Sequence, residues 1–177
     1  KTASTWFQTY GYPSHPEINL LNKGDLDPIF YSSFVAPDGI NFDLSKFEMD
    51  FMVNSNNESH KGSISGVCEE NLTGNPWTGR NSDSLLLRIS EQFKGCKVII
   101  SIRNQKTMIE SLYSNYVKSG GMLSFSSLLN DLPIEGGLIK GKLEYHNLIK
   151  KYFDVFGKSN VMVYMYEDFV LEPEVVL

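Results

Sequence analysis

The stretch KVIISIRNQKTMIESLYSNY, residues 97–116, decides the fold class of this chain. It begins with the apolar run 98–102, whose length and β-branched residues predict a strand buried on both faces of a parallel sheet. From Thr107 onward the apolar residues recur at helical spacing, at Met108, Ile109, Leu112, Tyr113 and Tyr116. A strand that passes within a few residues into a helix is the repeating unit of α/β proteins.

Two polar residues of this unit form a candidate anion site. Arg103 follows the strand directly, so we expect it at the edge where open α/β sheets bind ligands. Ser111 lies two turns into the helix that follows. A guanidinium group presents a planar fork of donors to phosphate oxygens, which makes a phosphate grip one interpretation. The alternative is an arginine that is satisfied by a structural carboxylate.

The remaining patterns extend the same architecture. Helical periodicity runs through 43–54, with Asp43 as its N-cap, and through 82–94, with Ser82 or Asp83 as its N-cap. A third helix is predicted over 142–156, and strands over 62–67 and 161–166. Alternating strands and helices predict one α/β domain over 1–177, with a parallel sheet flanked by helices.

The segment 14–41 differs from these because it is rich in proline and glycine. We predict a long loop with local structure here, and loops of that length often serve as lids or binding loops. Its aromatic residues Phe30, Tyr31 and Phe34, together with Trp77, are candidates for lining an acceptor pocket.

Composition excludes several classes of protein. The net charge of −5 over 177 residues argues against a general nucleic-acid binder, which needs a basic surface. Cys68 and Cys96 are too few for a disulfide scaffold or a zinc site, so we expect two buried thiols. No apolar run of membrane length and no signal-peptide pattern occurs in the sequence, which favours a cytoplasmic protein. The oligomeric state is left open.

The first six residues, KTASTW, place a cation, small residues and three hydroxyls ahead of an apolar helical run. This is the composition of an anion-binding turn at a helix N-terminus. The segment resembles the 5′-phosphosulfate loop of sulfotransferases, usually written K-S/T-G/A-S/T-S/T-W. Arg103-Asn104 with Ser111 resembles the 3′-phosphate motif of that family, and Tyr166-Glu167-Asp168 resembles the Y-E-D that closes another core strand.

The resemblance is to the sulfotransferases that use 3′-phosphoadenosine 5′-phosphosulfate (PAPS). Gln105 stands where cytosolic members commonly carry proline, so the motif resembles that of bacterial and carbohydrate-directed members more closely. The resemblance implies the P-loop-kinase-like sulfotransferase fold. Since the family's phosphate loop follows a strand and this sequence begins on the loop lysine, we expect a domain truncated at both ends.

The implied reaction is in-line transfer of a sulfuryl group from PAPS to a hydroxyl or amine acceptor, a small molecule or a carbohydrate. The product is 3′-phosphoadenosine 5′-phosphate (PAP), and no metal is required. By resemblance, Lys1 neutralises the leaving phosphate, while Thr2, Ala3, Ser4 and Thr5 wrap the 5′-phosphate. The remaining donor residues are Trp6 near the adenine, Arg103 and Ser111 on the 3′-phosphate, and Tyr145 stacked on the adenine. Trp6 and Tyr145 fit plain core packing as well.

The family also needs a base that takes the acceptor proton. Glu70, in the frame E-x-L-S/T-G, is the first candidate, ahead of its neighbour Glu69 and of His60. A Glu70 that only caps or pairs with a cation is the alternative. We expect Glu167 and Asp168 to satisfy backbone N–H groups. Two rival functions are an inactive PAP-binding module and a nucleotide kinase, whose G-x-x-x-x-G-K-S/T motif is absent from the sequence.

Overall fold

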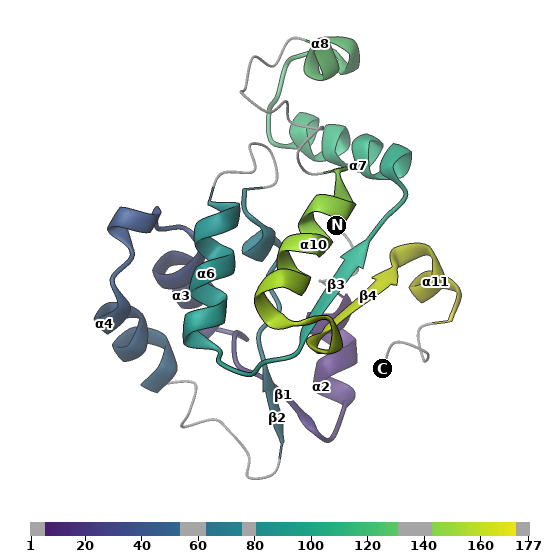
Figure 1. Ribbon diagram of the computed structural model, residues 1–177. Helices are drawn as coiled ribbons and strands as arrows, with labels where there is room; N and C mark the ends of the chain where they lie inside the picture. Colours follow the sequence, from purple (N-terminus) through teal and green to yellow (C-terminus); the bar gives the residue numbers. More distant parts are fainter. Residues whose placement is uncertain (1–5, 54–62, 76–80, 131–142, 173–177) are drawn as a thin grey trace.

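The structure is a computed structural model that describes residues 6–53, 63–75, 81–130 and 143–172 (Figure 1). Within these residues two pairs of parallel strands are flanked by helices, which confirms the predicted α/β class. β1 (Ile18–Leu20) pairs with β2 (Ile64–Gly66). β3 (Val98–Ile102) pairs with β4 (Val161–Met165), and Ile102 lies opposite Met165. The two strands of each pair therefore end at the same edge.

The helical segments include those that the periodicity predicted and several that were not predicted. In chain order they are η1 (Phe7–Gly11), α2 (Tyr12–Ser14), α3 (Leu26–Phe30), η2 (Tyr31–Val35), η3 (Gly39–Asn41), α4 (Leu44–Phe47), η4 (Glu48–Met52), η5 (Glu70–Thr73), α6 (Ser82–Gln92), α7 (Gln105–Lys118), α8 (Phe125–Asn130), α10 (Tyr145–Phe156), η6 (Lys158–Asn160) and α11 (Tyr166–Leu171). Asp43 caps α4 as predicted, since its carboxylate accepts the Lys46 N–H at 3.1 Å. The predicted cap of α6 is wrong by one residue, because Asn81, at φ 66°, stands at the N-cap.

One face of the β3–β4 pair is covered by α10. Leu86, Ile100, Tyr152 and Val161 form a buried cluster there. The prediction that β3 is buried on both faces is wrong for the opposite face. On that face Ile99 and its partner Met162 are 51% and 44% exposed. Among the described residues, Phe7 covers this face, and it packs against Tyr164 near the carboxyl end of β4.

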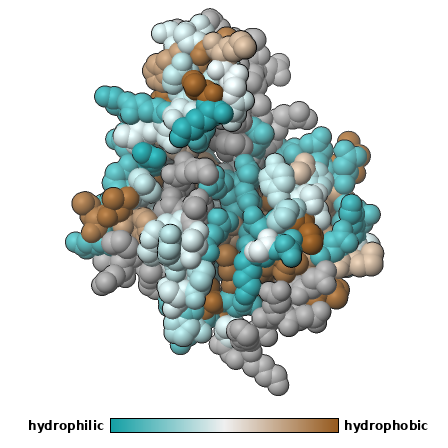
Figure 2. Space-filling view, turned by 180° about the vertical axis from the view of Figure 1, so that it is seen from behind, coloured by the Kyte–Doolittle hydropathy of each residue, from teal (hydrophilic) through white to brown (hydrophobic). Residues whose placement is uncertain are grey.

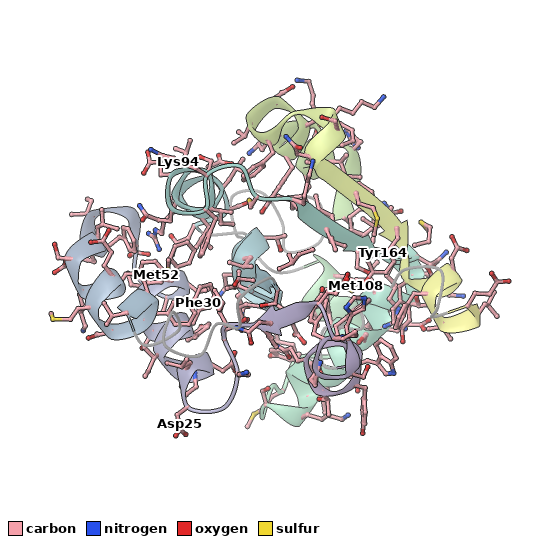
Figure 3. The ribbon with its side chains drawn as sticks, turned by 90° about the horizontal axis from the view of Figure 1, so that it is seen from below. Asp25, Phe30, Met52, Lys94, Met108 and Tyr164 are labelled. Atoms are coloured by element: carbon pink, nitrogen blue, oxygen red, sulfur yellow. The ribbon has the colours of Figure 1, made fainter. Side chains whose placement is uncertain are left out.

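Residues 14–41 hold more regular structure than the predicted long loop with local structure. The segment contains β1 and three helical segments, and it supplies much of the largest core cluster. Phe30 and Phe34 are 0% exposed and stack at 5.1 Å between ring centroids, so neither lines an acceptor pocket. Figure 3 shows Phe30 inside the molecule with Met52, which packs against the same cluster. Trp77 lies outside the described residues.

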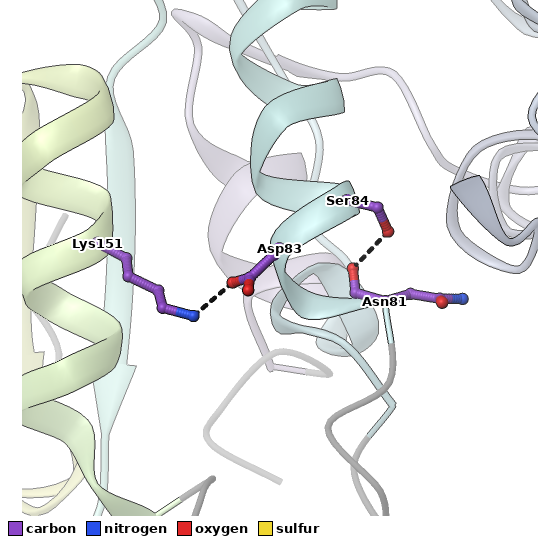
Figure 4. Close-up of polar contacts among 4 residues, drawn as sticks. All are labelled: Asn81, Asp83, Ser84 and Lys151. Carbon is purple, nitrogen blue, oxygen red and sulfur yellow. Dashed lines mark hydrogen bonds and ion pairs between the residues drawn. The ribbon is translucent and has the colours of Figure 1, made fainter. Parts of the chain in front are cut away.

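The helix α6 joins this cluster to α10. Its Leu85 and Ile89 are buried among the aromatic side chains, as the periodicity predicted. Beside them Arg88 is 4% exposed, donates hydrogen bonds to the carbonyls of Phe34 and Pro37, and stacks on the Phe42 ring at 3.9 Å. On the outer side, Lys151 of α10 pairs with Asp83 of α6, and Ser84 donates to the Asn81 carbonyl (Figure 4).

The surface seen from behind mixes polar and apolar side chains, with one apolar group at the end that carries α8 and others at the sides (Figure 2). Met122 and Leu123, in the segment between α7 and α8, are 94% and 39% exposed. Among the described residues, no helix combines the length and the apolar character that crossing a membrane requires.

Candidate active site

The carboxyl edge of β3 carries Arg103 in a defined orientation. Its Nε–H donates to Thr107 Oγ1 at 3.0 Å, and its Cζ lies 4.8 Å from the centre of the Tyr166 ring. Asn104 then begins α7, because its side chain accepts the N–H groups of Lys106 and Thr107 at the N-cap. In the described part of the chain no carboxylate forms an ion pair with Arg103.

A second contact joins the Arg103 motif to the Y-E-D segment. The Asn104 N–H donates to Glu167 Oε1 at 3.0 Å, so this carboxylate satisfies a loop N–H group as predicted. Parallel pairing of β3 with β4 makes this contact available, because the two strands end side by side. Two of the three motifs therefore meet at one edge of the sheet.

The helix that follows the first motif lies against the same edge. Trp6 packs edge-on against Phe169 of α11, with ring centroids 5.0 Å apart, and Phe7 packs on Phe169 at 4.9 Å. Residues 1–5, which include the predicted ligands Lys1, Thr2, Ala3, Ser4 and Thr5, lie outside the described residues. The half-buried Trp6 makes core contacts, and its position beside adenine stays a prediction.

Ser111 lies on α7, the helix that follows Arg103, and Tyr145 reaches Arg103 from α10. Ser111 is half-buried on α7, four residues beyond Thr107, so the two hydroxyls lie on one helix face. Tyr145 is the first residue of α10. Its hydroxyl is buried near the Arg103 backbone, yet outside hydrogen-bonding geometry with any described residue. Burial raises its pKa, the neighbouring Glu167 carboxylate acts in the same direction, and Arg103 acts against them.

The candidate base belongs to a segment held by buried amide groups. Asn22, 1% exposed, accepts the Cys68 N–H and donates to the Cys68 carbonyl, both at 2.8 Å. Gln8 of the first helix donates to the same carbonyl at 2.6 Å. Residues 69–70 follow directly, so the first helix and the Glu70 segment are tied together.

The two glutamates of this segment have different environments. Glu69 caps η5, since its Oε1 accepts from the Asn71 N–H at 3.0 Å and from the Asn71 amide at 2.8 Å. Glu70 is exposed at the first position of η5. His60 lies outside the described residues.

The Cys68 thiol of this segment and the Tyr12 phenol lie near Tyr164 of β4, and both have raised pKa values. Burial, with smaller contributions from Glu69, Glu70 and Asp27, raises the pKa of the Cys68 thiol to about 12. Burial also raises the pKa of Tyr12 to about 12, and the nearby Cys68 and Tyr164 groups act in the same direction. Cys68 is therefore an uncharged thiol at neutral pH. Cys68 and Cys96 are free thiols, but both are half-buried rather than buried as predicted.

Two residues that shape the site were not singled out from the sequence: Asn22 and Thr107. Thr107 had a usable signal, because a residue four positions after Arg103 lies one turn into the helix. Asn22 had none, since its contact is with a segment 46 residues away. Tyr166 was named in the Y-E-D motif, but its contact with Arg103 was not predicted. Among the described residues no group of three His, Cys, Asp or Glu side chains could hold a metal ion.

Comparison with known proteins relates the whole chain to one solved structure. No protein-family model and no curated protein sequence matches this chain. The crystal structure of a sulfotransferase from Alicyclobacillus acidocaldarius matches with a TM-score of 0.65 at 20% sequence identity, over 99% of this chain and 73% of that one. The sequence motifs and this match agree on the architecture, and the chain therefore has a sulfotransferase-like fold.

Proposed function

We propose that this chain transfers a sulfuryl group from PAPS to a hydroxyl or amine acceptor. The observation that carries the proposal is the meeting of two motifs at one sheet edge, with Trp6, the last residue of the first motif, packed against the helix that follows β4. Arg103 stacks on Tyr166, Asn104 binds Glu167, and Trp6 packs on Phe169. The sulfotransferase-like fold supports the same assignment.

The proposed roles follow from the charges that the reaction moves. Sulfuryl transfer, like phosphoryl transfer, requires positioning and charge stabilisation more than covalent chemistry. Lys1 neutralises charge on the leaving 5′-phosphate, which Thr2 to Thr5 enclose. Arg103 and Ser111 hold the 3′-phosphate, with the half-buried guanidinium supplying paired donors.

Glu70 is the proposed base. Its position in the frame E-x-L-S/T-G supports this role, and its side chain is exposed. A Glu70 variant that retains the full transfer rate would move this role to Glu69 or His60. A carbohydrate is the acceptor we propose first, because the resemblance is to carbohydrate-directed members.

Calorimetric titration with PAP, and with ADP plus magnesium, tests the donor class. The proposal predicts saturable PAP binding and weak ADP binding, because only PAP carries a 3′-phosphate for Arg103. A preference for ADP would instead indicate a nucleotide kinase. PAP binding without transfer to any acceptor in a sugar and small-alcohol screen would indicate an inactive binding module.

A further inference from the structure

We infer that Tyr166 is a positioning residue that fixes the plane of the Arg103 guanidinium and thereby sets selectivity for a 3′-phosphorylated nucleotide. The inference rests on the proposed function, and it assigns to the Y-E-D segment a role in ligand selectivity beyond satisfying backbone groups. It starts from the position of the Arg103 Cζ, 4.8 Å from the ring centre.

Two contacts restrict the arginine side chain from different directions. The first is the 3.0 Å hydrogen bond from Nε to Thr107 Oγ1. The Thr107 hydroxyl donates its own proton to the Asn104 carbonyl at 3.1 Å, so a lone pair faces Arg103. This bond anchors one edge of the guanidinium but still allows rotation about that edge. The Tyr166 ring, lying on the guanidinium face, limits this rotation.

The terminal nitrogens of Arg103 are left for a ligand. In the described part of the chain, the Nε bond is the hydrogen bond that Arg103 donates, and neither Nη group has a partner there. A planar fork with both Nη groups directed away from its anchor matches two oxygens of one phosphate. Selectivity then depends on holding that fork in a single orientation before the ligand arrives.

The ring also keeps Arg103 away from a competing anion. Glu167 uses Oε1 to accept the Asn104 N–H, while its Oε2 is buried and has no hydrogen-bond partner among the described residues. Tyr145 interacts electrostatically with both Arg103 and Glu167, which places the two charges in one neighbourhood. Without the ring, a guanidinium free to rotate would pair with this carboxylate and lose its availability to a phosphate.

Tyr166 can act as a fixed platform because it is held independently of Arg103. It begins α11 directly after β4, and the adjacent Glu167 is bonded to Asn104. Phe169, one turn further, is 4% exposed and packs against Trp6 and Phe7. The backbone under the ring therefore stays in place when the ring is replaced.

The test compares PAP and AMP binding by calorimetry in the unmodified chain and in Tyr166→Phe and Tyr166→Leu. The selectivity is the AMP dissociation constant divided by the PAP constant. We expect Tyr166→Phe to retain it, because the ring face is unchanged. Tyr166→Leu should weaken PAP binding by roughly 2- to 30-fold, from the usual strength of a cation–ring contact, and leave AMP binding unchanged. Unchanged AMP binding also shows that the variant is folded.

The outcomes separate this inference from the proposed function. An unmodified chain that binds AMP as tightly as PAP overturns the proposed donor. If the unmodified chain is selective and Tyr166→Leu is equally selective, the role of the ring is overturned. The role is also overturned if Tyr166→Phe loses as much selectivity as Tyr166→Leu. In an Arg103→Ala background, Tyr166→Leu should have no further effect on selectivity. Tyr166→Met replaces Tyr166→Leu if the leucine variant does not fold.

Discussion

Replacing Asn22 by aspartate exchanges one buried amide nitrogen for an oxygen and leaves the shape of the side chain unchanged. In the structure that nitrogen donates to Asp27 Oδ1 at 3.0 Å and to the Cys68 carbonyl at 2.8 Å, and Asn22 is 1% exposed. An ionised carboxylate would therefore face two acceptors, one of them charged. The Cys68 N–H, which Asn22 Oδ1 accepts, would keep its partner.

The expected cost follows from the choice between two unfavourable states. The introduced carboxyl can stay ionised and unpaired, or it can take up a proton and donate to one acceptor. Protonating an ordinary aspartate costs about 4 kcal/mol at pH 7 and about 1.5 kcal/mol at pH 5. One lost hydrogen bond adds about 1 kcal/mol at either pH. We expect Asn22→Asp to lower the free energy of unfolding by up to about 5 kcal/mol at pH 7 and about 2.5 kcal/mol at pH 5.

The sign of this pH dependence is fixed by linkage. Burial and the facing acceptors raise the pKa of the introduced carboxyl in the folded state above its value in the unfolded chain. The penalty is therefore smallest below the unfolded pKa and grows as the pH rises toward the folded one. Because the folded variant binds one more proton than the unfolded variant, lowering the pH from 7 to 5 reduces the difference in unfolding free energy between the variant and the unmodified chain.

Urea unfolding of both chains at pH 5, 6 and 7 measures the difference directly. Asn41→Asp is the matched control, because Asn41 is exposed, and its effect should stay within about 0.5 kcal/mol at each pH. An equal loss of stability for Asn22→Asp at pH 5 and pH 7 would refute the buried-donor reasoning. A loss below about 1 kcal/mol at pH 7 would refute it as well.

Three further predictions follow from single contacts. Glu70→Gln should keep PAP binding and lower the transfer rate by roughly 10²- to 10⁴-fold. Initial rates with PAPS and an identified acceptor measure this effect, and an unchanged rate would show that Glu70 is not the base. Gly11→Ala should lower the free energy of unfolding by about 1–3 kcal/mol, because a Cβ at this position would lie 2.7 Å from the Trp6 ring. Gly66→Ala is the control in thermal unfolding, because a Cβ at Gly66 would have no heavy atom within 4 Å. Burial raises the pKa of Tyr152 from 10.0 to about 12. The unfolded chain therefore loses this proton at a lower pH than the folded chain, and the free energy of unfolding falls as the pH rises through that range. In urea titrations, Tyr152→Phe should reduce this fall by up to about 2.7 kcal/mol, and an identical fall in both chains would contradict the assignment.

The sequence was most informative where the decisive interactions are local. β3 occupies the bounds that its β-branched run predicted, and α7 begins where Asn104 offers its side chain to two N–H groups two and three residues away. A strand and a capped helix of this kind are specified by neighbours in the chain, so Arg103 could be placed at the sheet edge without a tertiary structure.

Prediction failed where burial depends on distant segments. Phe30 and Phe34 stand among prolines and glycines, which indicated a loop, yet both are 0% exposed. They are buried because Phe47 and Phe51, from a later helical segment, pack against them. A local pattern carries no information about such partners, and the assignment of Phe30 and Phe34 to an acceptor pocket was wrong for that reason.

The sequence by itself therefore determined the α/β class, the main strands and helices, and the motif residues on which the proposed function depends. Only the tertiary structure decided that polar residues such as Asn22 and Arg88 are buried, because the groups they bind lie 46 and 54 residues away along the chain. It also placed the Tyr166 ring beneath Arg103 through the parallel pairing of β3 with β4. Burial of a polar group is stable only with its hydrogen bonds made, and those partners come from folding rather than from sequence neighbours.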